Sequence, residues 1–599
     1  MKCRKLLLAL SSISFLLQCA SAQTLQSRPR RVSEVAYNAV VSEPATPAAS
    51  SATREGELES FVPRVGLVYY VEIRSAGLAA MARSGALATL AKSFLGTSQK
   101  GALNIRPETL ASLPALANTT IGLAGYRSGR LMAFFETASE SDAAQLKGVL
   151  EPVKSAVWLR GRTVCASLGT AGSAAENSEG GAVIGEDPEF SGAYQRFAGE
   201  QFFAFFSTGP LLGLPANNDP AYTPAMMAGL ASMPSAVAAA GSIEGDRFVV
   251  RALTLGGSTG KPAGIAGLFS SIFSSQSPGQ PIAASFVPGD TDVFIDVMLD
   301  WDRLYDSISG VFGMVAGSMN GGGSPAGAQS MDFLGAIESK LGFSIKNDLI
   351  PTLGNELAIS ISGFDKMFMG PAARPAGARG AAAPTTPQSP HFLFMASVKE
   401  PARFEKLIAR VFEADGMSAT PPVRTPYRNA VIVHTKSVAY TVANGFFAIS
   451  GSTADIRRVL DAPQSGSSLA SNEEFRGAIP DASKAVMHLY VSPGTTARVI
   501  DMLVKDSNLK AELRATASSP GSNGIGLLMT PEGDHSMFEL RAPSSLVFKM
   551  ISALASAKPG GVSIMRGVPG IGIPDSSGPG SAPVRKSPTL TNDDVVRRP

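Results

Sequence analysis

Histidine is the side chain that most often carries out acid–base chemistry or binds a metal near neutral pH. This chain of 599 residues contains only four: His391, His434, His488 and His535. None of them pairs at the short spacings of known metal-binding motifs, and most lie within or beside segments predicted to be strands. This pattern favours partly buried or surface strand residues, with a dispersed metal or acid–base site as the alternative.

A second candidate is a run of aspartates at the start of the second half of the chain: Asp290, Asp292, Asp296, Asp300, Asp302 and Asp306. A Ca²⁺ site needs several carboxylate oxygens that converge in one tight loop. Here a strand followed by a helix is predicted, so alternation and helical rotation should turn most of these side chains toward solvent. We interpret Asp300 as the N-cap of a helix that begins at Trp301.

Two Ser-x-x-Lys tetrads occur, at Ser258–Lys261 and Ser507–Lys510. In penicillin-recognising enzymes this spacing places a lysine amine one helical turn from a serine nucleophile. The companion motifs Ser-Asp-Asn and Lys-Thr-Gly are missing from the sequence, and Ser507 is a natural helix N-cap. Residues 256–261 also resemble a phosphate-binding loop, but Leu255 replaces its first glycine and Pro262 its magnesium-binding hydroxyl residue.

Cys165 lies in strand-like sequence between Val164 and Ala166, which predicts a buried, inert thiol rather than a reactive one. No zinc-protease helix or dinucleotide-binding Gly-x-Gly-x-x-Gly motif is present. We therefore expect a protein that is not an enzyme. The sequence yields no catalytic, cofactor-binding or metal-binding residue, and no cofactor is expected.

The first residues of the chain predict export. Lys2, Arg4 and Lys5 precede an apolar run from Leu6 to Leu17 and a small-residue cleavage site at Ala20-Ser21-Ala22. The alternative is a lipoprotein anchored at Cys19. Signal cleavage would lower the formal net charge from +3 to zero, so a nucleic-acid partner is not expected. No later segment is long and apolar enough to predict a transmembrane helix, which indicates a periplasmic or extracellular protein.

The rest of the chain contains an internal repeat of two similar halves. Similar landmarks recur in the same order: a Phe-Val-Pro start at 61–63 and 286–288, a Pro-x-Leu turn at 114–116 and 351–353, a strand–helix pair, an acidic pair before Phe190 and Phe475, and a Glu-Gly-Asp hairpin at 244–246 and 532–534. Chance matches would not preserve this order, so we predict a duplication. The expected fold class is α+β, with two tandem modules, largely antiparallel sheets and packed helices.

Composition predicts where these modules begin and end. Stretches rich in Pro, Gly, Ser and Ala cannot bury enough apolar surface to offset the entropy of ordering them. The predicted boundaries are a signal peptide at 1–22, a flexible leader at 23–60, a first module at 61–275, a linker at 276–285, a second module at 286–556 with a disordered insertion at 371–390, and a disordered tail at 557–599.

Two segments carry the clearest local patterns. Residues 341–361 predict a helix end, an apolar turn with Leu349 and Leu353 buried, and a strand in which Leu357, Ile359 and Ile361 share one face. Residues 265–273 place apolar side chains on one side of a helix. That helix, like the stripe formed by Leu546, Val547, Met550, Ile551 and Leu554, is expected to pack on the sheet of its own module, with a membrane or partner anchor as the alternative.

The start at Val287-Pro288-Gly289-Asp290-Thr291, the 341–361 unit and the Asn444-Gly445-Phe446-Phe447 strand before Ser-Thr-Ala-Asp carry a family resemblance. They resemble a bacterial exported family, domain-of-unknown-function family 3352, best over residues 286–541. The resemblance implies export and an α+β fold and supplies no catalytic residues. We expect a non-enzymatic binding or scaffolding protein with an unknown protein or hydrophobic ligand as partner. The alternatives are a carrier of a lipid or other hydrophobic ligand, and a secreted hydrolase.

Overall fold

The computed structural model describes the chain in segments. They are residues 58–83, 119–127, 130–151, 156–168, 182–207, 235–255, 278–309, 333–364, 390–414, 421–480, 482–503, 507–517, 524–532 and 535–549. The predicted signal peptide, the insertion at 371–389, the tail at 557–599, the turn at Pro114 and the helix at 265–273 lie outside these segments.

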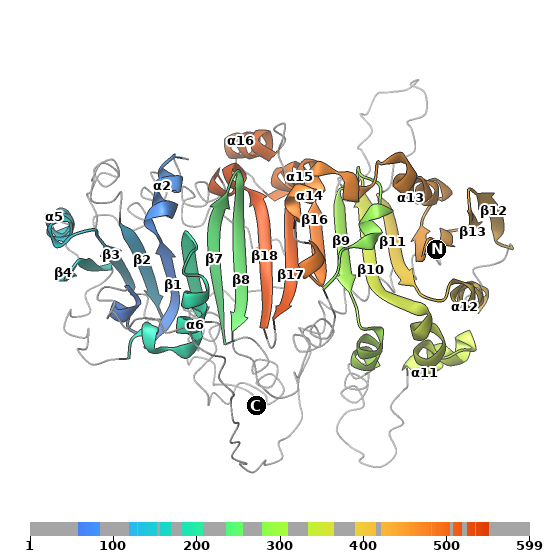
Figure 1. The fold of residues 1–599 in the computed structure, drawn as a ribbon, viewed down its shortest axis with the longest axis horizontal. Helices are drawn as coiled ribbons and strands as arrows, with labels where there is room; N and C mark the ends of the chain where they lie inside the picture. Colours follow the sequence, from blue (N-terminus) through green and yellow to red (C-terminus); the bar gives the residue numbers. More distant parts are fainter. Residues whose placement is uncertain are drawn as a thin grey trace, which may run out of the picture. The chain divides into compact units, whose positions relative to one another are not determined.

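The described strands form one sheet of 18 strands, and every pair in it is antiparallel, which confirms the predicted α+β class (Figure 1). In the first half of the chain the strands are β1 (Leu67–Ile73), β2 (Thr120–Tyr126), β3 (Leu131–Glu136), β4 (Ala156–Arg160), β5 (Thr163–Leu168), β6 (Phe202–Ser207), β7 (Ala236–Glu244) and β8 (Arg247–Leu255). In the second half they are β9 (Val293–Met298), β10 (Leu353–Ser362), β11 (His391–Val398), β12 (Val423–Tyr427), β13 (Ala430–His434), β14 (Ala439–Ala443), β15 (Phe446–Ser450), β16 (Met487–Val491), β17 (Ile525–Glu532) and β18 (His535–Pro543).

Strand pairing gives both halves one strand order. Read from the outer edge inward, the first half is β4-β5-β3-β2-β1-β6-β7-β8. The second half is β14-β15-β11-β10-β9-β16-β17-β18, with β13 and β12 added outside β14. The last strand of each half pairs with that of the other, so β8 and β18 join the halves, with Arg251 opposite Glu539.

Short helical elements precede, connect or follow the strands. They are η1 (Leu58–Phe61), α2 (Ser75–Arg83), α5 (Glu140–Leu150), η5 (Ile184–Glu186), α6 (Pro188–Arg196), η6 (Ile282–Ser285), α11 (Phe333–Leu341), η7 (Ile345–Leu349), η8 (Ile350–Thr352), α12 (Pro401–Ala414), α13 (Thr453–Ser465), η10 (Leu469–Ser471), α14 (Glu473–Ala478), η11 (Ala482–Lys484), α15 (Pro493–Leu503) and α16 (Ser507–Ala517). Residues 301–309 and 544–549 are also helical.

Helix capping explains several of these starts. The Asp187 carboxylate accepts hydrogen bonds from the backbone N–H groups of Glu189 and Phe190, and so begins α6. The Asn472 side chain does the same for α14 in the second half. Ser452 accepts a hydrogen bond from Asp455 N at the start of α13.

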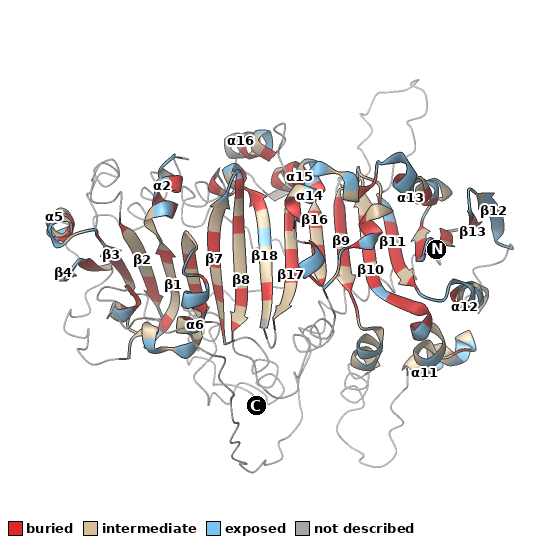
Figure 2. Ribbon diagram, in the orientation of Figure 1, coloured by how far each residue is buried: buried red, intermediate tan, exposed pale blue. Residues whose placement is uncertain are grey.

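The two faces of the sheet are covered differently. The first face carries Tyr70 and Phe205 in one half and Phe294 and Tyr490 in the other, in two large buried clusters. Elements η1, η5 and α6 supply the first cluster, and η6, α13, η10 and α14 supply the second. The second face is covered in places by α5, by helix 301–309 and by α12. Figure 2 shows the alternation of burial along the strands that results.

Apolar residues at two of the predicted boundaries are buried in the clusters. Leu58 is in the predicted leader, but it lies in η1 and is 1% exposed. Ala283 and Ala284 are in the predicted linker, yet η6 places both in the core of the second half. In both halves, buried helical residues therefore precede the Phe-Val-Pro landmark.

The predicted turn before β10 is confirmed in part. Leu353 is buried, but Leu349 is only partly buried, because it packs at the margin of the cluster that contains Phe404 and Phe447. Helix 544–549 also departs from expectation. Leu546 packs against α15 and α16, whereas Phe548 reaches the first half, where its ring lies 5.8 Å from that of Phe248. This helix therefore does not pack on the sheet of its own module alone.

Candidate functional site

The structure separates the histidines that it describes. His434 is exposed at the end of β13, whereas His488 is fully buried on β16. His391, on β11, is half-exposed, and its Nδ1 lies 3.2 Å from Asp455 Oδ2. The side chain of His535 is outside the described part. Within the described residues no three histidine, cysteine or acidic side chains form a group that could hold a metal ion.

The aspartates of the 290–306 run point to different partners. Asp300 accepts a hydrogen bond from Arg303 N and caps helix 301–309, as predicted. Asp292 accepts a hydrogen bond from Thr495 Oγ1 at 2.9 Å, and Asp290 forms an exposed ion pair with Arg458. Asp296 does not face solvent, because it points into the core of the second half.

The candidate nucleophiles, like the aspartates, do not converge on one described site. Cys165 on β5 is 1% exposed, and burial raises the pKa of its thiol to about 12, so the reactive thiolate is scarce at neutral pH. The tetrad at Ser258 and the loop at 256–261 lie outside the described residues. Helix α16 begins at Ser507, whose side chain is not described.

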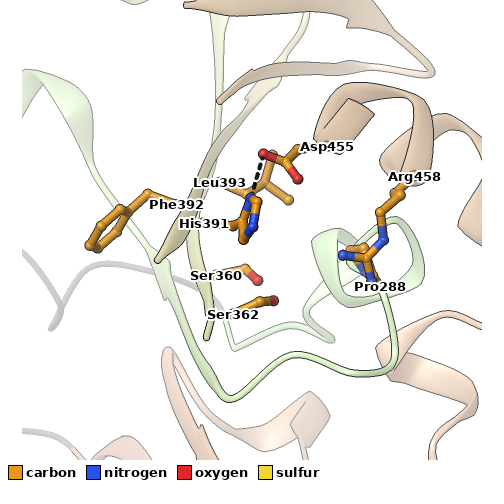
Figure 3. A pocket seen from close by; sticks show the side chains of 8 residues that line it. All are labelled: Pro288, Ser360, Ser362, His391, Phe392, Leu393, Asp455 and Arg458. Atoms are coloured by element: carbon orange, nitrogen blue, oxygen red, sulfur yellow. Dashed lines mark hydrogen bonds and ion pairs between the residues drawn. The ribbon is translucent and has the colours of Figure 1, made fainter. Parts of the chain in front are cut away.

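A small hollow opens beside His391 (Figure 3). Ser360 and Ser362 line it from β10, and Asp455 lines it from α13. The Asp455 carboxylate also accepts hydrogen bonds from Ser450 and Ser452, each at 2.8 Å. A capping role at the start of α13 therefore accounts for the His391–Asp455 contact.

The most unusual polar group is buried between β9, β10 and β16. His488 Nδ1 lies 2.9 Å from Asp296 Oδ2, and His488 Nε2 lies 2.7 Å from the carbonyl oxygen of Ala482. A carbonyl only accepts, so Nε2 carries a hydrogen. One further proton must then lie between Nδ1 and the carboxylate, which makes this a hydrogen-bonded acid–imidazole pair inside the core.

Glu356 completes this buried group. Its Oε1 accepts a hydrogen bond from Ala283 N at 2.6 Å, and its carboxyl lies near that of Asp296. Burial first, and then the charge of Asp296, raise the pKa of Glu356 to about 9. Glu356 is thus protonated at neutral pH and can donate to the Asp296 carboxylate, whose buried Oδ1 has no hydrogen-bond partner among the described residues.

This raised pKa predicts how stability depends on pH. Below about pH 4.5 the Glu356 carboxyl is protonated in both folded and unfolded chains, and its contribution to stability is fully present. That contribution should fall by about 1.4 kcal/mol per pH unit as the pH rises toward 9. Glu356→Gln keeps the hydrogen bonds without the ionisation. The unfolding free energies of the wild type and of the Glu356→Gln variant, measured by denaturant titration from pH 5 to 9, should therefore differ by an amount that changes steadily with pH. A difference that is constant with pH would contradict the assignment.

The first half buries a carboxylate at the corresponding strand position. Glu72 on β1 faces Phe203 on β6, as Asp296 on β9 faces His488 on β16. Its oxygens accept hydrogen bonds from the hydroxyls of Tyr70 and Tyr194 and from Arg74 Nε, all at 2.9 Å. Both halves therefore bury a carboxylate on the first face at matching strand positions.

The opposite face of these central strands is apolar and less buried. Cross-strand pairing places one row of side chains side by side on β18, β17, β16, β9 and β10. We call this row the apolar strip; its members are Leu540, Leu527, Leu489, Ile295 and Ile359. Leu540 is 37% exposed, and the others are intermediate in exposure. None belongs to a described buried cluster.

The rows of side chains on either side of the apolar strip pack against described helices, and the strip itself does not belong to those clusters. The next row along the strands, which includes Val297 and Met487, packs under Trp301 and Leu304 of helix 301–309. On the other side, Ile525 packs against α15 and α16. Sequence reasoning grouped Ile359 with Leu357 and Ile361 on one face but had no means of showing that this face is the more open one.

Comparisons with known proteins add little to this geometry. No family model matches the chain, and no curated protein matches it. Among solved structures, the chain is similar to crystal form III of TP0453, with a TM-score of 0.20 and 11% identity over 47% of this chain and 99% of that chain. Crystal form IV of TP0453 gives a TM-score of 0.20 and 10% identity over 46% and 97% of the two chains. The resemblance to domain-of-unknown-function family 3352 stays a prediction.

Proposed function

We propose that this chain is a non-enzymatic binding protein whose ligand carries a long apolar chain, and that the apolar strip is its binding surface. One observation carries the proposal: at the centre of the second half, polar side chains are buried on one face of the sheet, and apolar side chains on the other face are partly exposed. The polar residues Asp296, Glu356 and His488 are 0–2% exposed, whereas the apolar side chains on the other face of the same strands are partly open. Buried polar groups and contiguous exposed apolar ones are the departures that indicate function.

The chemistry of the strip favours an acyl chain over a protein partner. Protein–protein interfaces carry about one hydrogen bond per 100–200 Å². The strip is made only of Leu and Ile side chains, and its backbone groups pair within the sheet. A polar group placed there would lose water without gaining a partner. Adjacent strands lie about 4.8 Å apart, so the strip is about 19 Å long, a length that suits an extended lipid tail.

Leu540→Glu tests the proposal, because this side chain is in the strip and already partly exposed. We expect the wild-type chain to bind a fluorescent sixteen-carbon fatty acid and Leu540→Glu to weaken that binding at least about tenfold, since a charge there would be desolvated by the bound chain. Val423→Glu is the matched control. Val423 is 60% exposed on the edge strand β12, outside the strip, and its replacement should leave the affinity unchanged.

A melting curve separates loss of binding from loss of folding, and both variants should melt within a few degrees of wild type. A wild-type chain that fails to bind the fatty acid would refute the proposal. Equal affinity for wild type and Leu540→Glu would refute the strip as the binding surface. Mass spectrometry of lipids that copurify with the native protein would identify the apolar chain of the natural ligand.

We also propose that the two halves arose by duplication and that the protein is exported to the periplasm or the extracellular space. Their common strand order and their matching caps, Asp187 and Asn472, support the duplication. The sequence of residues 1–22 supports export, with a lipoprotein anchored at Cys19 as the alternative. No described helix is both long enough and apolar enough to span a membrane.

A further inference from the structure

The junction of the two halves carries a network of charges on the first face of the sheet. Arg251 on β8 donates to carboxylate oxygens from both halves. Its partners are Glu200 at 2.7 Å, Glu244 at 2.7 Å and Glu539 at 2.9 Å. Arg541 on β18 donates to Glu539 at 2.6 Å and to Glu244 at 3.2 Å. Both oxygens of Glu244 and both of Glu539 are therefore engaged by these two arginines.

Arg247 lies beside this network on the same face, since it is two alternations from Arg251 along β8. It is 7% exposed, and its Nη1 and Nη2 atoms are buried. Neither nitrogen has a hydrogen-bond partner in the part of the chain that the structure describes. Burial lowers the pKa of Arg247, and the charge of Arg541 lowers it further.

A buried guanidinium without a partner is costly, because it loses its hydration and gains no hydrogen bond in return. The carboxylate that faces it across the hairpin, Glu244, is already engaged by Arg251 and Arg541. Asp246 contributes only a nearby charge. The Nη1 and Nη2 donors of Arg247 therefore remain without a partner, because Glu244 and Glu539 already pair with the other two arginines.

We propose that Arg247, with Arg541 beside it, binds an oxyanion of the phosphate or carboxylate class at the junction of β8 and β18. The guanidinium offers parallel N–H donors that match two oxygens of one such group. Arg541 adds a second positive charge. The site is on the opposite face from the apolar strip, because Glu539 and Leu540 alternate along β18, so it does not depend on the proposed function.

The test compares melting temperatures of the full chain in sodium phosphate and in sodium chloride at equal ionic strength. A second set of melts compares sodium acetate with sodium chloride. A third set compares vesicles that contain phosphatidic acid with vesicles of phosphatidylcholine alone. Three chains are needed: wild type, Arg247→Met and Arg514→Met. Met keeps an apolar stem of similar length. Arg514 is the matched control, since its side chain is 65% exposed and pairs with Asp501 on the surface.

We expect the anion to raise the wild-type Tm by about 2 °C or more, because a ligand that binds only the folded chain stabilises it. Arg514→Met should respond equally and Arg247→Met not at all. Without anion, Arg247→Met should melt no lower than wild type, since it removes an unpaired buried charge. A response to inorganic phosphate or acetate identifies a free anion, and a response only to phosphatidic acid identifies a lipid headgroup. If wild type responds to none of them, or if Arg247→Met responds as wild type does, the proposal is overturned.

Discussion

Replacing Asp296 with alanine should lower the free energy of unfolding by about 3–5 kcal/mol. The carboxylate is 0% exposed and lies between His488 Nδ1 and the protonated carboxyl of Glu356. Without it, the hydrogen between Nδ1 and Asp296 and the proton of Glu356 lose their acceptor in a place that water does not reach. Such a loss costs the full desolvation penalty of the orphaned groups. Denaturant titration at pH 7 measures the change.

Asp290→Ala is the control for this experiment. Asp290 belongs to the same aspartate run, but its side chain is 67% exposed and pairs with Arg458 at the surface. Exposed ion pairs contribute about 0–1 kcal/mol, so this variant should be nearly as stable as wild type. A loss below about 1 kcal/mol for Asp296→Ala would show that the buried contacts with His488 and Glu356 do not stabilise the fold.

Leu353→Ala should cost about 2–5 kcal/mol. Leu353 is the first residue of β10 and is 7% exposed, in a cluster with Val398, Phe404 and Phe447. Truncation removes apolar contacts and leaves a cavity that β10 and β11 cannot close, because both strands are held by pairing on either side. Thermal and denaturant unfolding measure the loss.

Leu159→Ala makes the same chemical change on the edge strand β4, where the side chain is 36% exposed. There the loss should stay below about 1 kcal/mol, because little buried area disappears. Equal losses at Leu353 and Leu159 would contradict the assignment of Leu353 to the core. Both variants should retain fatty-acid binding, since neither residue is in the apolar strip.

Local structure was determined largely by the sequence itself. The Glu-Gly-Asp turn set the hairpin of β7 and β8, where Gly245 adopts a φ of 64° that favours glycine. Asp300 caps the helix that it was predicted to cap, and Ser452, a residue type that favours this position, caps α13. These features depend on a few neighbouring residues, and their hydrogen bonds close within one turn. Neighbouring residues were therefore sufficient to predict them.

Tertiary structure decided which face of each strand is covered. Alternation in β10 separates Leu357 and Ile359 from Glu356 and Ala358, but it does not say which set meets other elements. Sequence patterns associate apolar side chains with the core. Here the face with Glu356 is buried because η6 and its alanines pack there, from a segment that composition predicted to be a linker.

Contacts between distant residues were likewise decided only by tertiary structure. Asp296 and His488 are 192 residues apart, and they meet because β9 and β16 pair in one register. The pairing of β8 with β18 brings Arg541 to Glu244, the carboxylate that faces Arg247. Glu244 therefore does not pair with the Nη donors of Arg247. Register is set by all the strands of a sheet together, and a shift of one residue would move each of these side chains to the other face.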